Sequence, residues 1–386
     1  MRLLDTYALN TGSKISKPFI YSKFFPLNIE KYITLQAKTP YDSRNYAYWQ
    51  EVIDGLNLYL SKYNIYIVQV GTKDETPYNG VINLLGHTSI NQLAHVIERS
   101  NLHFGSDSLC VHLASHYDKP IVSLYSISNP NVAGPHFGDK SKHILLKGYE
   151  RIGNKKPSYS QVEHPKSINT IKPEEIIKAV LDLLNIKHDH LNKTLFFGQD
   201  YNLRSFEVIP DDKFDINNVS IDNPIIRMDY FFNEKALEDI LKNKKCIIFT
   251  DKPIKKDILE ANKTNINQLI YIIDENNDVK FAKLLKSNSI PYVLLSFLDQ
   301  EILNKYKFDY MDYNLIINKK HKTKEDLGIK IDDFNNLRYK SSRLLLSSKG
   351  ESISKYDWLH GTKDKVIDDP EFWKEIDNFY IYSIDN

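Results

Sequence analysis

The sequence has few cysteines and no dominant charge. Cys110 and Cys246 are its two cysteines, and they do not form a CxxC pair. This pattern argues against a disulfide scaffold and favours a reducing compartment, so we expect a cytoplasmic protein. The 51 Lys and Arg residues against 50 Asp and Glu residues leave a formal charge of +1. Such a balance gives no global field that would draw the chain onto nucleic acid or anionic lipid.

Long apolar runs and several well-known motifs are also missing. No stretch approaches the roughly 18 uninterrupted apolar residues of a membrane span, and the first thirty residues do not join a basic start to an apolar run. We therefore expect neither a signal peptide nor a transmembrane segment. GxGxxG, P-loop and GxSxG patterns are absent, which argues against Rossmann dehydrogenases, P-loop kinases and the usual serine hydrolases.

The length and the hydrophobic patterns predict two α/β domains. A chain of 386 residues is longer than one hydrophobic core usually supports. Residues 31–190 alternate β-rich runs with helical patterns, as in a doubly wound sheet, and a similar series begins after a polar stretch at 188–193. The sequence thus predicts two Rossmann-like domains, residues 1–190 and 194–386.

The expected elements follow from the same patterns. We expect strands at 31–37, 65–70, 80–85, 101–107 and 119–126 in the first domain, and at 223–231, 245–251, 268–274 and 291–297 in the second. A helix is expected to open at Pro173, because proline suits the first helical turn. Segment 337–348 is expected to form a helix that packs across both domains.

The most informative stretch is residues 86–126. A predicted strand ends at Asp107, and the next helix begins at Ser108. Backbone amides and the helix dipole would then favour an anion beyond the sheet edge. Open α/β sheets bind ligands outside the carboxyl ends of their strands, which is where Asp107 and Ser108 would lie.

Three ordered elements in this half resemble a known family. The order Asp-Ser-x-x-x-His-Leu-Ala at 107–114, followed by Lys-Pro and a strand, resembles the nucleotide-sugar half of the ADP-heptose lipopolysaccharide heptosyltransferases, glycosyltransferase family nine. Gly-His-Thr-Ser at 86–89 with Leu93, and SRNYAYWQEVIDGL at 43–56, are similar to two further elements of that family. The resemblance covers about residues 30–185.

The resemblance implies a GT-B-type glycosyltransferase. Such an enzyme would move a sugar from a nucleoside-diphosphate sugar to an acceptor hydroxyl with inversion, without a metal and with no cofactor besides the nucleotide sugar as co-substrate. Arg44 would neutralise phosphate charge, and the leaving diphosphate would be stabilised by the amides after Asp107. The donor-binding residues implied in this way are Arg44, Thr88, Ser89, Asp107, Ser108, His112 and Lys119.

The sequence departs from the family pattern in two respects. Leu109 and Cys110 stand where the family usually has Gly and Pro. The donor-like domain also comes first, whereas the family places an acceptor-binding domain before it. Two arrangements remain open: a circularly permuted GT-B enzyme whose residues 194–386 form the acceptor domain, or a truncated family fold with an unrelated appendage.

The catalytic base and the acceptor are open as well. Inversion requires a base from the partner domain, for which Asp229 and Asp251, each at the end of a predicted strand, are the candidates. The family suggests a surface glycan as the acceptor, and a modified base in viral DNA is the alternative, with the basic run at 318–326 as a contact for nucleic acid. A non-catalytic nucleotide-sugar or glycan-binding protein is the alternative from another class.

Each candidate residue also has an ordinary structural explanation. Asp107 could be a helix N-cap, His112 a core histidine, and Arg44 a solvated surface charge. His112 and His116 share a helical spacing that suits a metal. A zinc site needs a third ligand, and the hydrolase motif needs Glu where this chain has Leu113, so no metal site is expected.

Overall fold

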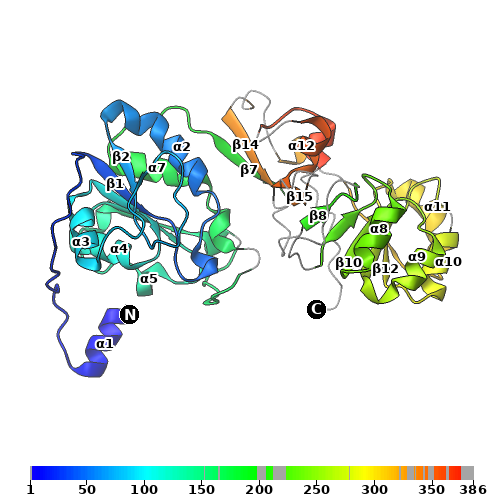
Figure 1. Cartoon of the computed structure of the whole chain (residues 1–386), viewed down its shortest axis with the longest axis horizontal. Helices are drawn as coiled ribbons and strands as arrows, with labels where there is room; N and C mark the ends of the chain where they lie inside the picture. Colours follow the sequence, from blue (N-terminus) through cyan, green and yellow to red (C-terminus); the bar gives the residue numbers. More distant parts are fainter. Residues whose placement is uncertain are drawn as a thin grey trace. The chain divides into compact units, whose positions relative to one another are not determined.

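The computed structural model describes residues 2–151, 153–163, 166–197, 206–211, 223–277, 279–320, 323–327, 334, 336–341, 344–346, 352–361 and 365–374. The chain divides into two compact units, Met1–Thr194 and Leu195–Asn386 (Figure 1). Each unit contains a largely parallel β-sheet and helices, so the predicted α/β class with two Rossmann-like units is confirmed. Within the described ranges, no helix combines the length and the apolar character that crossing a membrane requires.

The first unit is built on a six-stranded parallel sheet. Its strands are β1 (Tyr32–Gln36), β2 (Tyr66–Gln69), β3 (Ile82–Asn83), β4 (Leu102–Ser106), β5 (Ile121–Tyr125) and β6 (His143–Lys147). They lie in the order β3-β2-β1-β4-β5-β6. Strands β1 and β4 are therefore central neighbours, and the direction in which strands are added reverses between them.

Helices cover both faces of this sheet. The helices are α1 (Leu3–Thr11), α2 (Trp49–Leu60), α3 (Ile90–Arg99), α4 (Leu109–His116), α5 (Pro130–Ala133), α6 (Gly148–Arg151) and α7 (Pro173–Leu183). Helices α2 and α7 pack on one face, and α3 and α4 pack on the other. The helical spacing of Trp49, Ile53, Leu56 and Leu60 accounts for the buried side of α2. Pro173 occupies the first turn of α7, as the sequence predicts.

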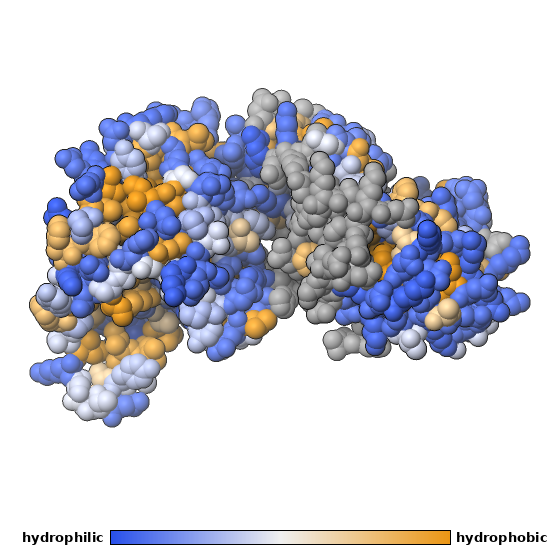
Figure 2. Space-filling model, in the orientation of Figure 1, coloured by the Kyte–Doolittle hydropathy of each residue, from blue (hydrophilic) through white to orange (hydrophobic). Residues whose placement is uncertain are grey.

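Helix α1 differs from the other helices of the first unit. It buries none of its residues, and Leu9 is 68% exposed. Figure 1 shows α1 set apart from the sheet at the end of an extended segment. Figure 2 shows that apolar side chains reach the surface of the first unit in several places.

The central strands approach each other closely at Gly105. A Cβ built at this position would overlap the backbone carbonyl oxygen of Gln36 on β1. A residue without a side chain is therefore required at the carboxyl end of β4.

The second unit contains another parallel sheet. The strands described in it are β8 (Phe206–Val208), β9 (Ile225–Arg227), β10 (Cys246–Thr250), β11 (Ile266–Ile272), β12 (Tyr292–Ser296), β13 (Ile316–Asn318), β15 (Leu344–Leu346) and β16 (Ser352–Ile353), in the order β13-β12-β11-β10-β9-β8-β15-β16. Strand β16 pairs antiparallel to β15. A separate two-stranded sheet joins β7 (Lys193–Phe197) to β14 (Leu337–Ser341).

The described helices of the second unit fall into two groups, one packed on a face of its large sheet and one packed against β14. They are α8 (Glu234–Leu241), α9 (Lys256–Ala261), α10 (Lys280–Ser287), α11 (Gln300–Tyr310), α12 (Lys355–His360) and α13 (Pro370–Lys374). Helices α8 to α11 share one core with the strands, while Ile225, Phe249, Ile270 and Leu295 form a separate buried cluster. Successive strands are added in one direction from β8 to β13, which keeps right-handed crossovers on one side.

The structure corrects one expected element and adds several that the sequence did not predict, among them β6, β8 and β13. Segment 337–348 is not the expected helix, because its described residues form β14 and β15. Leu337 and Tyr339 are buried while Arg338 and Lys340 are less so, and this alternation is the period of a strand. Strand β6 was not predicted, because it is only partly buried along its length and follows an irregular stretch.

A buried histidine makes the first unit sensitive to acid. His103 on β4 is 0% exposed, its Nδ1 lies 3.0 Å from the Thr34 hydroxyl, and its Nε2 has no hydrogen-bond partner. Burial lowers the pKa of His103 from 6.5 to about 3, against a smaller opposing effect of the hydrogen bond at Thr34. The unfolded chain therefore binds a proton at pH values where the folded chain does not.

We expect the free energy of unfolding of the first unit to fall as the pH drops from about 6.5 towards about 3, because protons then favour the unfolded state. The slope of this free energy against pH reports the number of protons that the chain takes up on unfolding. Replacing His103 by Gln should lower that number by up to one. Urea titrations followed by Trp49 fluorescence, with Trp358 and Trp373 changed to Phe, measure this unit. An unchanged slope in the His103→Gln variant would contradict the assignment.

Candidate functional site

The candidate site lies at the carboxyl edge of the first sheet. Arg44 follows β1 in a short 3-10 turn, Asp42–Arg44, and Asp107 follows β4 directly. Because β1 and β4 are neighbours, both residues reach the point where the strand order reverses. Ligands of open α/β sheets bind at such a point.

Arg44 and Asp107 form a partly buried ion pair. Arg44 Nη1 lies 3.3 Å from Asp107 Oδ2 and donates to the Asp107 carbonyl oxygen at 3.2 Å. The Ser128 hydroxyl donates to the same carboxylate at 2.6 Å, and the Ser106 hydroxyl donates to the Arg44 carbonyl at 2.7 Å. Asp107 is 4% exposed, so its carboxylate faces Arg44 and Ser128 rather than solvent. Arg44 is held in place from two sides and is not a freely solvated charge.

The start of α4 has no side-chain cap. Ser108 is its N-cap residue, so the alternative of Asp107 as a helix cap is wrong. The Ser108 hydroxyl donates to Gln36 Oε1 on β1 and accepts no hydrogen bond from the amides at the start of the helix. The first amides of α4 therefore keep their hydrogen-bonding capacity at the carboxyl edge, where the helix dipole favours an anion. Leu109 is 50% exposed beside them, and Cys110 is buried in the core.

His112 lies one turn further along α4. Its side chain is exposed, so the alternative of a core histidine is wrong. The surrounding protein lowers the pKa of His112 below its ordinary value, although Asp107 acts in the opposite direction. A neutral imidazole at neutral pH can both donate and accept hydrogen bonds. The described residues contain no group of three ligating side chains that could hold a metal with His112 or His116.

The remaining predicted donor residues are not brought to the same point. Ser89 caps α3 in a reciprocal pair of hydrogen bonds with Gln92, and Thr88 precedes it, partly buried. Both follow β3 at the carboxyl edge, without a hydrogen bond to Arg44 or Asp107 among the described residues. Lys119 precedes β5 and lies at the amino edge of the sheet. The prediction that Lys119 lies beside the diphosphate is therefore wrong, because α4 returns the chain to the opposite edge of the sheet before Lys119.

A cavity adjoins Arg44. Its volume is about 320 Å³. It is lined by Tyr41, Arg44, Ile127, Ser128, Asn129, Val132, Ala133, Tyr159 and Gln161. Arg44 lies over the Tyr41 ring, with 5.3 Å between Cζ and the ring centroid. Sequence reasoning missed every lining residue except Arg44. The position of 127–133 directly after β5 was the available signal, since all loops that follow parallel strands meet at this edge.

The two candidate bases lie at the carboxyl edge of the second sheet. Both oxygens of Asp229 accept hydrogen bonds from the buried Arg227, from Nε at 2.8 Å and Nη2 at 2.5 Å. Arg227 also pairs with Glu207 on β8. Asp251 follows β10, and its buried Oδ1 has no hydrogen-bond partner. Burial raises the pKa of Asp251, and the nearby carboxylates Asp229 and Asp274 raise it further.

The first unit is therefore of the Rossmann-like class, with an arginine and an uncapped helix start at the edge where its strand order reverses. Residues 66–161 match Glycosyltransferase family 9 (heptosyltransferase), so the resemblance noted in the sequence is confirmed over this segment. A stretch of 104 residues, 27% of this chain, is 30% identical to Lipopolysaccharide heptosyltransferase 2 of Salmonella typhimurium and covers 29% of that protein.

Solved structures of the same family are similar to part of the chain. The glycosyl transferase family 9 protein from Veillonella parvula is 20% identical with a TM-score of 0.33, and the match covers 47% of this chain and 50% of that one. ADP-heptose lps heptosyltransferase II of E. coli is 17% identical with a TM-score of 0.32, covering 47% and 51%. The chain thus spans about half the length of these structures and less than a third of the curated relative.

We expect Arg44 and Asp107 to be energetically coupled, because removing either residue leaves the charge of the other unpaired in a partly buried site. In a double-mutant cycle of Arg44→Ala and Asp107→Ala, the coupling in the free energy of unfolding should be about 1–3 kcal/mol. The exposed pair of Asp118 and Lys142 in the same unit is the matched control and should show negligible coupling. Additive effects of the Arg44 and Asp107 substitutions would contradict this expectation.

Proposed function

We propose that the chain is a glycosyltransferase whose first unit binds a nucleoside-diphosphate sugar. One observation carries the proposal: an arginine held by a buried carboxylate lies beside the uncapped start of a helix, where the strand order of the sheet reverses. Cationic and amide donors that converge at this place suit a diphosphate. The match of residues 66–161 to a glycosyltransferase family supports the same conclusion.

Arg44 and the first amides of α4 are proposed to bind the diphosphate. Among described residues, the guanidinium of Arg44 makes its contacts with Asp107 through Nη1, so Nη2 keeps its donors for a ligand. Asp107 would orient Arg44 rather than touch the phosphate, because the negative charges of its carboxylate and of the phosphate would repel each other. Charge that develops on the leaving diphosphate would be stabilised by these fixed donors without a metal ion.

The cavity beside Arg44 is proposed to hold the sugar. Tyr41 and Tyr159 offer aromatic surface, and Asn129 and Gln161 offer amide groups. His112 on α4 does not line this cavity; as a neutral imidazole, it would bond a hydroxyl of the donor without adding charge. The polar and aromatic groups of this cavity suit a ligand with many hydroxyl groups.

We assign the role of general base to Asp251 rather than Asp229. Both oxygens of Asp229 are occupied by Arg227, whereas Asp251 keeps a buried oxygen without a partner. A raised pKa brings a carboxyl group closer to the range that suits a general base. We further propose that the second unit supplies the acceptor side and that transfer inverts the anomeric carbon.

A glycan hydroxyl is the acceptor that we propose. The curated relative that matches part of the chain is named a lipopolysaccharide heptosyltransferase, which supports a glycan over the alternative of a modified base in viral DNA. The basic run at 318–326 includes residues 321–322, which lie outside the described ranges. Cys110 and Cys246 are free and buried, which is compatible with the proposed cytoplasmic location.

We expect one of the common nucleoside diphosphates to stabilise the protein. At a ligand concentration of 100 times Kd, the gain is about 2.7 kcal/mol, or a rise in Tm on the order of 5–10 °C for a unit of this size. Arg44→Ala and Asp107→Ala should abolish the shift, measured for each variant against its own unliganded Tm. Lys119→Ala, at the opposite edge, should retain it. No shift with any nucleotide would remove the main support for the donor site.

Asp251→Asn should slow donor turnover by about 10²–10⁴-fold and leave the nucleotide-induced Tm shift intact, because a base acts on the chemical step. The assay is release of nucleoside diphosphate from the sugar nucleotide that gives the largest shift. Asp229→Asn is the comparison and should act mainly on stability, through the loss of its pair with Arg227. If the wild type binds donors but shows no turnover with any acceptor glycan, the chain is a nucleotide-sugar-binding protein instead.

A further inference from the structure

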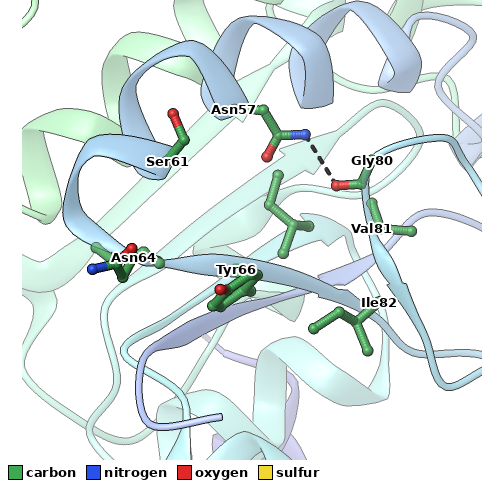
Figure 3. Close-up of a pocket in the computed structure, with 9 residues that line it drawn as sticks. Asn57, Ser61, Asn64, Tyr66, Gly80, Val81 and Ile82 are labelled. Carbon is green, nitrogen blue, oxygen red and sulfur yellow. Dashed lines mark hydrogen bonds between the residues drawn. The ribbon is translucent and has the colours of Figure 1, made fainter.

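A second cavity lies at the opposite, amino edge of the first sheet. Its volume is about 370 Å³, at the small end of the range of roughly 300–1,000 Å³ for ligand pockets. Figure 3 shows it between the end of α2, the start of β2 and the segment that leads into β3. Tyr66 and Ile82 are the first residues of β2 and β3, so this cavity is separated from Arg44 by the length of the strands.

The rim of this cavity carries neutral polar groups that are available to a ligand. Asn57 Nδ2 donates to the Gly80 carbonyl at 3.0 Å, shown by the dashed line in Figure 3, and its Oδ1 forms no hydrogen bond with the described residues. Within the same ranges, the side chains of Ser61, Asn64 and Tyr66 also form no hydrogen bond. Two amides and two hydroxyls thus surround one opening.

Two left-handed backbone positions hold the rim. Asn64 has φ of 54° and ends the turn after α2, and Gly80 has φ of 77° opposite it. A Cβ at Gly80 would lie 2.7 Å from Asn57 Nδ2, so glycine allows the close contact between this loop and α2. These two backbone positions fix the turn and the loop on either side of the opening, and the Asn57 side chain joins the loop to α2.

The cavity has apolar walls and no charged lining residue. Ile65, Ile67, Val81 and Ile82 supply aliphatic surface, and Tyr66 is 48% exposed. A phosphate or a nucleotide would find no cation here. A ligand that combines apolar C–H faces with several hydroxyl groups matches both the ring of Tyr66 and the neutral rim.

We propose that this cavity binds a neutral saccharide ring. A nucleobase fits less well, because the lining contains one aromatic ring and branched aliphatic side chains rather than two flat surfaces. The site would hold a glycan at a place remote from the donor cavity and would thereby raise the local concentration of a glycan chain. It does not depend on the proposed transfer reaction, since a binding protein could use it equally.

Saturation-transfer NMR on the full chain tests the proposal. The probes are the methyl glycosides of glucose, galactose, mannose and N-acetylglucosamine, with adenosine and uridine as comparisons. We expect at least one glycoside to bind with a Kd on the order of 1 mM, as is reasonable for a small ligand in an open cavity. Tyr66→Ala should weaken it by about tenfold or more. Tyr63→Ala is the matched control, because Tyr63 is also 48% exposed in the adjacent turn but does not line the cavity.

A second variant guards against misfolding of Tyr66→Ala. Ser61→Glu adds a bulky charge at the exposed rim and should also abolish binding of the glycoside. Failure of all glycosides to bind, equal losses in the Tyr66 and Tyr63 variants, or stronger binding of a nucleoside would each overturn the proposal. Displacement of the glycoside by a nucleoside diphosphate would place it in the donor cavity instead. Nucleotide binding is measured in a separate experiment. Its absence would count against the proposed donor site but not against this cavity as a saccharide site.

Discussion

The close approach of β1 and β4 is the constraint on which the first unit depends. Gly105 lets the two central strands meet at the carbonyl of Gln36, and their loops then leave the sheet side by side. This adjacency brings Arg44 to Asp107, although the two residues are 63 positions apart in the sequence. Ser128, from the loop after β5, completes the same group of contacts. Charge pairing, the uncapped start of α4 and the neighbouring cavity all follow from one pair of strands.

The ion pair and the helix start make different contributions to the site: the first positions a cation, and the second supplies unpaired backbone amides. A buried carboxylate alone would be costly, and an exposed arginine alone would be mobile. Together they give a cation with a defined position and spare donors next to unpaired amides. In the second unit, Arg227 lies between Glu207 and Asp229 and is fully enclosed, so the same residue types there hold strands together instead of facing a ligand.

Sequence patterns were sufficient for the central strands of the two sheets and for the helix start at Ser108, but not for strands such as β6, β8 and β13. Buried parallel strands such as KYITLQA and QLIYIID are short apolar runs, and the helices between them have clear apolar stripes. The pattern at 107–114 also indicated the carboxyl edge correctly. Segment 337–348 was misassigned because its three consecutive leucines suggest a helix, while the alternation at Leu337 and Tyr339 was too short to outweigh them.

The composition of the site was harder to predict, because it depends on which loops meet. Lys119 is twelve residues from Asp107 in sequence, yet α4 carries the chain to the other edge of the sheet before it. Tyr41, Ser128 and Tyr159 are far apart in sequence and share no motif, so only the order of strands brings them to one cavity. Likewise, Glu207 and Arg227 become partners only when β8 and β9 pair.

The two sheets also differ in how they can be assembled during synthesis. From β8 to β13, each strand of the second sheet pairs with the one made just before it, so this part can grow at its edge as the chain emerges. In the first sheet, Ile33 on β1 pairs with Leu102 on β4, which is synthesised much later. Strands β2 and β3, on the other side of β1, are synthesised before β4. Pairings between distant residues are slow to form. A ribosome that paused before β4 would therefore expose the open side of β1 to the surrounding medium.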